Sequence, residues 1–340
     1  MRQFKIFLKV LLVIVLLVAA IVFWLAYKPM PAQITYGMSF NTMYARELGL
    51  DWKETYDAIL HELGVRHLRL AAHWPMIEPI RDTYNFEELD YQIKEAEKVN
   101  ATMVLAVGRR LPRWPECHIP QWAREQSTED QQAEVLAYIQ TVVERYKNSS
   151  ALEYWQVENE PYLSVFAYEY CGKFDEAFFE KEIALVRALD PTHPILVTDS
   201  GNLGTWAGAY RHGDAFGTSE YVYFWNPDLG QFKTFLPPWF YRAKESVMAL
   251  LYGRKPTMLI ELAAEPWLLE PVVNVPISVQ LTRMDVDKFN SILAYARDTR
   301  YDTQYLWGAE WWYWLKMQEG GNDTMWERGK SLFSGVDVPK

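Results

Sequence analysis

The sequence is short of the residues on which several common kinds of protein depend. It has only two cysteines, Cys117 and Cys171, which are too few for a disulfide-rich scaffold and do not show the spacing of a zinc site. Basic residues are outnumbered, with 34 Lys and Arg against 44 Asp and Glu. Because the net charge is -10, we expect no nucleic-acid partner.

Several sequence motifs are also missing. No GxGxxG follows the first predicted strand, which argues against a dinucleotide-binding fold, and no GxSxG follows any strand, which argues against a serine hydrolase. The six histidines show no HExxH or similar spacing. We therefore expect neither a metal ion nor an organic cofactor. No linker rich in Pro, Gly or Ser divides the chain and no short repeat is visible, so one folded domain is the simplest organisation.

One long hydrophobic run lies near the beginning of the chain. Residues 10–27, VLLVIVLLVAAIVFWLAY, carry no charge over 18 positions, about the length of helix that crosses a bilayer. Three basic residues precede the run: Arg2, Lys5 and Lys9. By the positive-inside rule, we expect residues 1–28 to be a single-pass anchor with a cytoplasmic N-terminus, and residues 29–340 to lie outside the cytoplasm at the cell membrane.

The alternative for this run is a cleaved signal peptide. Val18, Ala19 and Ala20 form its best cleavage site, but they lie inside the run. The run is longer than the usual signal-peptide core and ends in bulky residues, which favours the anchor.

From residue 33 onward, short apolar runs alternate with longer amphipathic ones. The runs typical of buried strands are QITYGMSF, VRHLRLAAHW, ATMVLAVG, ALEYWQVENE, PILVTDSG, AFGTSEYVYFW, PTMLIEL and TQYLWGAEWW. A helical pattern follows each run, although after the fifth it is only a short segment near residues 203–210. Eight such units over about 300 residues predict an α/β fold, a (β/α)8 barrel, with an open doubly wound sheet as the runner-up.

Glutamates stand where two of these strands end. Glu160 closes the fourth run and is followed by Pro161, and the seventh run leads directly into Glu261. They are 101 residues apart, about 34 for each of three units, which is the size of a βα repeat. Because chemistry in such barrels lies at the carboxyl ends of the strands, we expect both carboxyl groups to face one pocket. Glu158 and Glu265 are the alternative candidates, because an error in the predicted strand register would put one of them in the place of Glu160 or Glu261.

Two carboxyl groups across a sugar-sized cleft are the equipment of glycoside hydrolysis, in which one protonates the leaving oxygen and the other attacks the sugar or activates water. Paired carboxylates also bind metal ions, but the histidine spacing does not favour that use. The remaining alternative is that Glu158 and Glu160 are solvated loop residues.

Four segments resemble glycoside hydrolase clan A, the retaining (β/α)8 enzymes with cellulase-like and β-galactosidase-like families. WQVENEP is similar to the strand-four motif, LIELAAEPW to the strand-seven segment, RLAAHWPMIEPIRDTYNFEELD to the strand-two pattern and AFGTSEYVYFW to the strand-six pattern. The segment IRDTY departs from many relatives, which have a glycine two residues before the tyrosine. That difference affects a turn and no catalytic residue.

The resemblance implies a role for each matching residue. Glu160 would be the acid/base, Glu261 the nucleophile and Asn159 the residue that holds the sugar 2-hydroxyl. Arg69 would favour the ionised nucleophile, unless it forms only a structural ion pair. Tyr221, or Tyr223 one register step away, would position Glu261. The remaining predicted substrate contacts are His73, Trp74 and Trp311, with Trp307 and Trp312 as alternatives to Trp311.

Aromatic rings and one long loop extend this prediction. Tryptophans near strand ends are suited to sugar stacking as well as to core packing, and are Trp74, Trp114, Trp122, Trp155, Trp225 and Trp267. The loop GRRLPRWPECHIPQW is too polar for core, and Arg109, Arg110, Glu116 and His118 are its candidate contacts with a sugar or an acidic group on it. Cys117 and Cys171 follow strands three and four, and in an oxidising compartment form either a disulfide or two thiols. A Cα separation beyond about 7 Å would exclude the bond.

The sequence thus predicts a membrane-tethered, monomeric, retaining glycosidase acting on an oligo- or polysaccharide. The alternatives are a membrane-tethered carbohydrate-binding pseudoenzyme and a tethered scaffold with an apolar outer patch.

Overall fold

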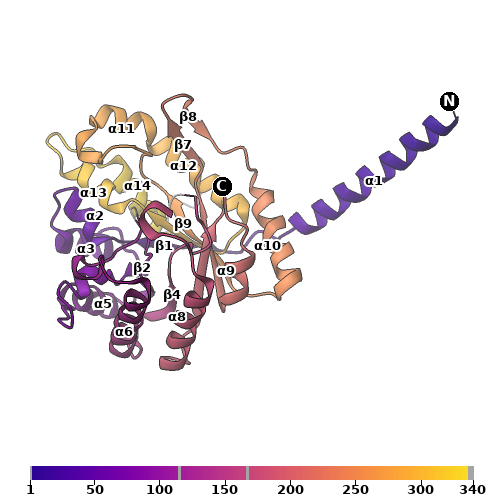
Figure 1. Cartoon of the computed structure of the whole chain (residues 1–340). Coiled ribbons are helices and arrows are strands. Elements are labelled where there is room, and N and C mark those ends of the chain that lie inside the picture. The colour runs from indigo at the N-terminus through magenta and orange to yellow at the C-terminus, as the bar shows by residue number, and fades with distance from the viewer. Residues whose placement is uncertain (1, 114–115, 166–167, 336–340) are drawn as a thin grey trace.

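The chain folds into a closed barrel of eight parallel strands (Figure 1). The structure is a computed structural model that describes residues 2–113, 116–165 and 168–335. The barrel strands are β1 (Thr35–Ser39), β2 (His67–Ala71), β3 (Thr102–Val107), β4 (Leu152–Val157), β5 (Ile195–Ser200), β6 (Ala215–Glu220), β9 (Thr257–Ala263) and β10 (Thr303–Trp307). Strands adjacent in this order pair with one another, and β10 pairs with β1 to close the barrel. The predicted (β/α)8 fold is confirmed.

Helices between successive strands form the outer layer. They are α2 (Thr42–Glu47), α3 (Trp52–His61), α4 (Trp74–Ile77), α5 (Glu87–Lys98), α6 (Thr128–Tyr146), α7 (Tyr168–Cys171), α8 (Glu176–Leu189), α9 (Ala207–His212), α10 (Pro238–Tyr252), α11 (Ile277–Arg283), α12 (Val286–Thr299), α13 (Ala309–Met317) and α14 (Thr324–Phe333), with short 3-10 turns η1 (Gln121–Ala123) and η2 (Val272–Asn274). Several of these helices are preceded by an N-cap residue whose side chain accepts hydrogen bonds from backbone N–H groups of the first turn, such as Asp51 before α3 and Ser127 before α6. The short α9 falls where only a short helical pattern was visible.

The barrel interior changes character along the strands. Its centre is apolar and is filled by Val104, Leu196, Ala215, Met258, Ile260 and Tyr305. Buried polar side chains, among them Arg69, Gln156, Thr198 and Ser219, also lie on these strands. A larger apolar core packs the outer faces of the strands against the helices. Because buried polar groups need hydrogen-bond partners, this polar layer constrains which side chains meet at the carboxyl mouth.

Two predicted strands end earlier than the sequence pattern indicates. The sixth run stops at Glu220, and its remaining aromatic residues enter a hairpin of β7 (Tyr223–Asn226) and β8 (Gly230–Lys233). The eighth run stops at Trp307, where Gly308 turns the chain at φ 122° into α13. A Cβ at Gly308 would lie 3.1 Å from the Ala264 backbone, so a side chain is disfavoured there both by conformation and by space.

Helix α1 (Arg2–Ala26) projects from the barrel beside α10, and its N-terminal end lies far from the other elements (Figure 1). Its segment Lys9–Ala26 is long and apolar enough to cross a bilayer, and a signal sequence would have the same properties.

Candidate active site

The two glutamates predicted from the strand ends meet at the carboxyl mouth of the barrel. Glu261 is on β9, and Glu160 follows β4 in a turn where Glu158 and Glu160 have φ of 56° and 44°. Positive φ is uncommon outside glycine and concentrates at functional sites. The Glu160 N–H donates to Thr198 Oγ1 at 2.9 Å, which ties the turn to β5. Both glutamate side chains are buried in the closed mouth.

Arg69 connects the two halves of the site from inside the barrel. Its Nη1 pairs with Glu261 Oε1 at 2.5 Å, its Nη2 donates to Asn159 Oδ1 at 2.8 Å, and its Nε donates to Gln156 Oε1 at 2.8 Å. The guanidinium is almost fully buried, so this charge is little screened by solvent. Arg69 therefore orients Glu261 and Asn159 together.

Asn159 is left with one free face. Its Oδ1 accepts hydrogen bonds from Arg69, from Gln156 Nε2 at 3.2 Å and from Thr198 Oγ1 at 3.4 Å. Among the residues that the structure describes, none accepts a hydrogen bond from Asn159 Nδ2. Because Oδ1 is held by these donors, the amide N–H groups remain available to a hydroxyl of a bound sugar.

Two hydroxyl groups on or beside β6 contact the two glutamates. Tyr221 donates to Glu261 Oε2 at 3.2 Å, and Ser219 donates to Glu160 Oε1 at 2.6 Å. Burial, followed by the neighbouring Glu261, raises the pKa of Tyr221 well above its usual value, so its phenol stays protonated and donates. The alternative to Tyr221, Tyr223, lies in the hairpin and donates to Ser291 instead.

The electrostatic environments of the two glutamates differ. Burial, with smaller contributions from the charges of Glu261 and Glu116, raises the pKa of Glu160 well above the usual value for a glutamate, although the Ser219 hydrogen bond opposes this. Glu261 instead faces the buried guanidinium of Arg69. The site therefore favours a protonated carboxyl at Glu160 beside an ion-paired carboxylate at Glu261.

The rival glutamates are both occupied elsewhere. Glu158 accepts the backbone N–H groups of Arg109 at 2.7 Å and Arg110 at 2.6 Å, and so fastens the loop after β3. Glu265, which follows β9, pairs with Arg113 at 2.9 Å. Neither contacts Arg69 in the described part of the chain.

The loop after β3 crosses the mouth of the barrel. Arg110 and Cys117 pair as an antiparallel bridge, and the Arg110 guanidinium pairs with Glu116 at 2.6 Å. Burial raises the pKa of Glu116, a third carboxyl group close enough to act on Glu160. Arg113 pairs with Glu265 in the segment after β9, and its guanidinium lies 5.1 Å from the centre of the Trp307 ring.

Of the two states expected for Cys117 and Cys171, the structure has the disulfide, and their Cα atoms are 5.4 Å apart. This separation is within the range that a disulfide requires. The bond joins the loop after β3 to the end of α7, and Cys117 follows Glu116 in the sequence.

Three residues predicted to contact substrate are buried and have partners other than Glu160 and Glu261. Trp74 is fully buried, donates a hydrogen bond from its indole N–H to Glu78, and stacks its ring on Tyr138. Trp311 is also fully buried, and its indole N–H donates to Gln280. The structure thus places both rings in the core and gives no support to the expectation that they contact substrate. They face the helical layer because α4 and α13 begin at once where each strand ends. His73 is also buried, with its ring edge-on to His118 at 4.7 Å.

Other aromatic rings lie nearer to the glutamates. The rings of Trp307 and Trp267 are 6.2 and 5.4 Å from that of Tyr221. The buried Trp307 Nε1 has no hydrogen-bond partner among the described residues. Trp155 is core, with its N–H on Asp190. Trp114 lies outside the described residues.

Several functional residues were missed by the sequence reasoning. Their hydrogen bonds connect Gln156 to Arg69, Thr198 to Glu160 and Asn159, and Ser219 to Glu160. Each of the three is a fully buried polar residue on a barrel strand. A polar side chain inside a buried strand was the available signal. Its partner could not be inferred because these contacts join strands far apart in sequence.

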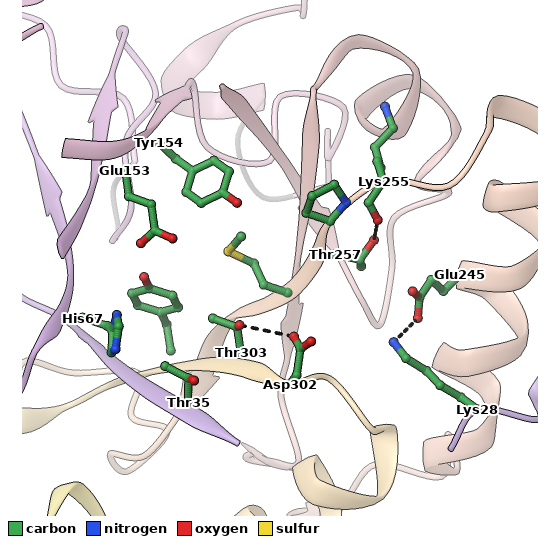
Figure 2. Close-up of a pocket in the computed structure, with 13 residues that line it drawn as sticks. Lys28, Thr35, His67, Glu153, Tyr154, Glu245, Lys255, Thr257, Asp302 and Thr303 are labelled. Carbon is green, nitrogen blue, oxygen red and sulfur yellow. Dashed lines mark hydrogen bonds and ion pairs between the residues drawn. The ribbon is translucent and has the colours of Figure 1, made fainter. Parts of the chain in front are cut away.

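A cavity of about 450 Å³ lies at the opposite mouth of the barrel. Figure 2 shows its lining, which includes Glu153, Tyr154 and Thr303 from the starts of strands and Lys28 from just after α1. Because catalysis in these barrels occurs at the carboxyl mouth, its size does not make it the active site.

The described residues contain one group whose atoms could hold a metal ion, formed by Glu176, Glu180 and His212. It lies on the outer surface of α8 and α9, and Glu176 is already paired with Arg211. It does not contact the two catalytic candidates.

The glycoside hydrolase family 42 profile, described as beta-galactosidase, matches residues 49–254. The match covers more than half of the chain and includes Glu160, and it ends before Glu261. No curated protein sequence matches this chain.

Solved structures share the fold. A β-galactosidase from the Antarctic haloarchaeon Halorubrum lacusprofundi is 14% identical with a TM-score of 0.55, and the match covers 89% of this chain and 58% of that one. A GH5_18 protein from Bifidobacterium longum subsp. infantis is 13% identical, with a TM-score of 0.62 and coverage of 91% and 80%. Xylanase 10B from Thermotoga maritima is 17% identical, with a TM-score of 0.52 and coverage of 81% and 83%.

Proposed function

Because this chain belongs to glycoside hydrolase family 42, within clan A, we propose that it hydrolyses O-glycosidic bonds with retention of configuration, Glu160 being the acid/base and Glu261 the nucleophile. The observation that carries the proposal is the contrast between the two carboxyl groups. Glu160 is buried with a raised pKa, whereas Glu261 is paired with Arg69. Carboxyl groups whose environments favour opposite protonation states are suited to the roles of acid and nucleophile.

In the first step, Glu160 gives its proton to the leaving oxygen while Glu261 attacks the anomeric carbon. Arg69 and Tyr221 hold the two Glu261 oxygens, so the carboxylate is oriented before substrate arrives. Asn159 Nδ2 donates to the sugar 2-hydroxyl as positive charge develops on the ring. In the second step, Glu160, now ionised, takes a proton from the water that releases the sugar.

The family description makes β-galactosides the first substrates to assay. An oligo- or polysaccharide with a terminal or internal β-galactosyl unit fits this description. Aryl β-galactosides with good and poor leaving groups, β-xylosides and natural oligosaccharides form a suitable panel. Binding without turnover on the whole panel would favour the pseudoenzyme.

The mechanism is tested by comparing Glu261→Ala and Glu160→Ala with a matched control. We expect Glu261→Ala to lose activity on every substrate. Glu160→Ala should retain the first step only for leaving groups that need no proton, so a product burst precedes slow turnover. Glu153→Ala is the control, because Glu153 is on the same strand as the Glu160 turn but at the opposite mouth. Inversion in NMR of the fresh product, or loss of activity in the control alone, would refute the assignment.

We also propose that residues 1–28 anchor a monomeric barrel, residues 29–340, outside the cytoplasm. The apolar Lys9–Ala26 segment, the basic residues before it and the disulfide support this. Protease added to intact cells should remove the barrel. Release of a barrel lacking α1 into the medium would favour a cleaved signal sequence, and protection until lysis would reverse the orientation.

A further inference from the structure

Helix α10 carries an exposed apolar stripe on the outside of the barrel. Trp239, Leu250, Leu251 and Tyr252 are all exposed, with Leu250 63% and Leu251 64% exposed. Trp239 and Leu250 are 11 residues apart, close to three helical turns, so they lie on the same side of the helix. The exposed residues therefore mark the two ends of one side of α10, and the consecutive Leu251 and Tyr252 turn progressively away from that side.

The same helix holds the end of α1. Arg242 Nε donates to Ala26 O at 2.7 Å, and Glu245 pairs with Lys28 at 2.8 Å. Arg242 and Glu245 lie near the middle of α10, between Trp239 and Leu250. Arg300, which follows α12, also donates to Lys28 O. The contact between α1 and α10 is thus fixed by hydrogen bonds and an ion pair, and exposed apolar residues of α10 lie on both sides of it along the helix.

These contacts set the depth of α10 if α1 spans a membrane. Ala26 is the last residue of the apolar segment, so it lies where the helix leaves the hydrocarbon layer. A side chain that contacts Ala26 O lies at that level too. Figure 1 shows α1 running away from the barrel beside α10, so this side of the barrel is the one nearest to the bilayer.

We propose that the exposed stripe of α10, Trp239, Leu250, Leu251 and Tyr252, rests in the interfacial layer of the lipid bilayer beside the anchor. The inference depends on the proposed anchor and not on the glycosidase reaction. Trp and Tyr favour this layer because their rings are apolar and their N–H and O–H groups stay in contact with water. The exposed Arg254, just after α10, is suited to the lipid phosphates.

Contact with the membrane through both α1 and α10 would hold the barrel in one orientation. Lys28 lines the amino-terminal cavity (Figure 2), so the anchor joins the barrel at the mouth opposite to the two glutamates. The carboxyl mouth, with Glu160 and Glu261, is then kept away from the point of attachment. A substrate in the surrounding medium reaches it without entering the bilayer.

The test is to measure the depth of a nitroxide label on the full chain in phosphatidylcholine and phosphatidylglycerol vesicles. Leu250→Cys and Leu251→Cys are labelled separately, and the native cysteines do not interfere because they are bonded to each other. Ile80→Cys is the matched control, because Ile80 is 66% exposed and lies in the segment between α4 and α5. Figure 1 shows α5 across the barrel from α10. Val13→Cys, within α1, reports on the anchor itself.

Relaxation by oxygen and by a water-soluble nickel chelate gives the depth of each label. We expect the ratio of oxygen to nickel accessibility to be several-fold higher at Leu250 and Leu251 than at Ile80, and highest at Val13. Water-like values at Leu250 and Leu251 with a deep Val13 would overturn the inference while leaving the anchor intact. Spin–spin broadening at Leu250 would overturn it in favour of a second copy of the chain. A water-like Val13 would refute the anchor and the inference with it.

Discussion

The hydrogen bond from Ser219 to Glu160 leads to a quantitative prediction for catalysis. Ser219 Oγ donates to Glu160 Oε1 at 2.6 Å, and both groups are buried. The bond stabilises the ionised form of Glu160 and so opposes the rise in its pKa caused by burial. In Ser219→Ala the donor is lost, and the pKa of Glu160 should rise further.

The size of the effect follows from the kind of bond. A hydrogen bond to a charged group contributes about 1.5–3 kcal/mol, and about 1.4 kcal/mol corresponds to one pH unit. The protonated carboxyl loses part of the same bond, so we expect a net change of about one pH unit. Activity that requires protonated Glu160 is lost as pH rises, so this basic limb should move to higher pH by that amount.

The assay is kcat/KM against pH for an aryl glycoside whose leaving group needs a proton. This profile reports the ionisation of the free enzyme. Ser219→Thr keeps a hydroxyl and should leave the limb near its original position. Ser200→Ala removes a buried hydroxyl from the end of the neighbouring strand β5 and should not move it. A basic limb that stays in place or moves to lower pH in a folded Ser219→Ala enzyme would refute the assignment of Glu160 as the acid.

Three further predictions concern other parts of the molecule. Trp307→Ala should lower kcat/KM with a small change in Tm. Trp311→Ala should instead lower the free energy of unfolding by about 3–5 kcal/mol, because Trp311 is fully buried in the core. Equal losses of stability in the two variants would contradict this prediction. Burial raises the pKa of Glu220, whose carboxyl oxygens have no hydrogen-bond partner among the described residues. The folded state therefore binds this proton more tightly than the unfolded state does. The free energy of unfolding should fall as pH rises above the pKa of Glu220 in the unfolded chain, by up to about 1.4 kcal/mol per pH unit. Glu220→Gln should therefore flatten urea-unfolding stability between pH 5 and 8, and an unchanged slope would show that Glu220 is not its source. Replacing both Cys117 and Cys171 by serine removes a disulfide that closes a loop with a sequence separation of 54, and should lower the free energy of unfolding by about 4 kcal/mol. Reduction of the wild-type protein should have the same effect. Reduction of the serine variant should leave its stability unchanged.

The order of the elements and the two glutamates could be predicted from the sequence. Each barrel strand is a local apolar run, and each helix that follows has its own period, so eight units could be counted without knowing their contacts. The separation of Glu160 and Glu261 then placed both at the same mouth, because parallel strands in a barrel share one direction. The same placement brought Cys117 and Cys171 into neighbouring segments but left open whether they are bonded, and the structure shows the bond.

Other features depended on contacts between distant residues. Whether a tryptophan after a strand enters the core or the cleft depends on whether a helix begins at once, as it does at Trp74 and after Gly308. The bonds of Arg69 to residues on β4 and β9, and of Ser219 to Glu160, join segments between 59 and 192 positions apart. Local periodicity contains no information on such distances. The sequence alone therefore determined which carboxyl groups reach the mouth of the barrel. The packing of the closed barrel decided which of them has a raised pKa and which is paired with Arg69, because burial and neighbouring charge exist only after the strands have come together.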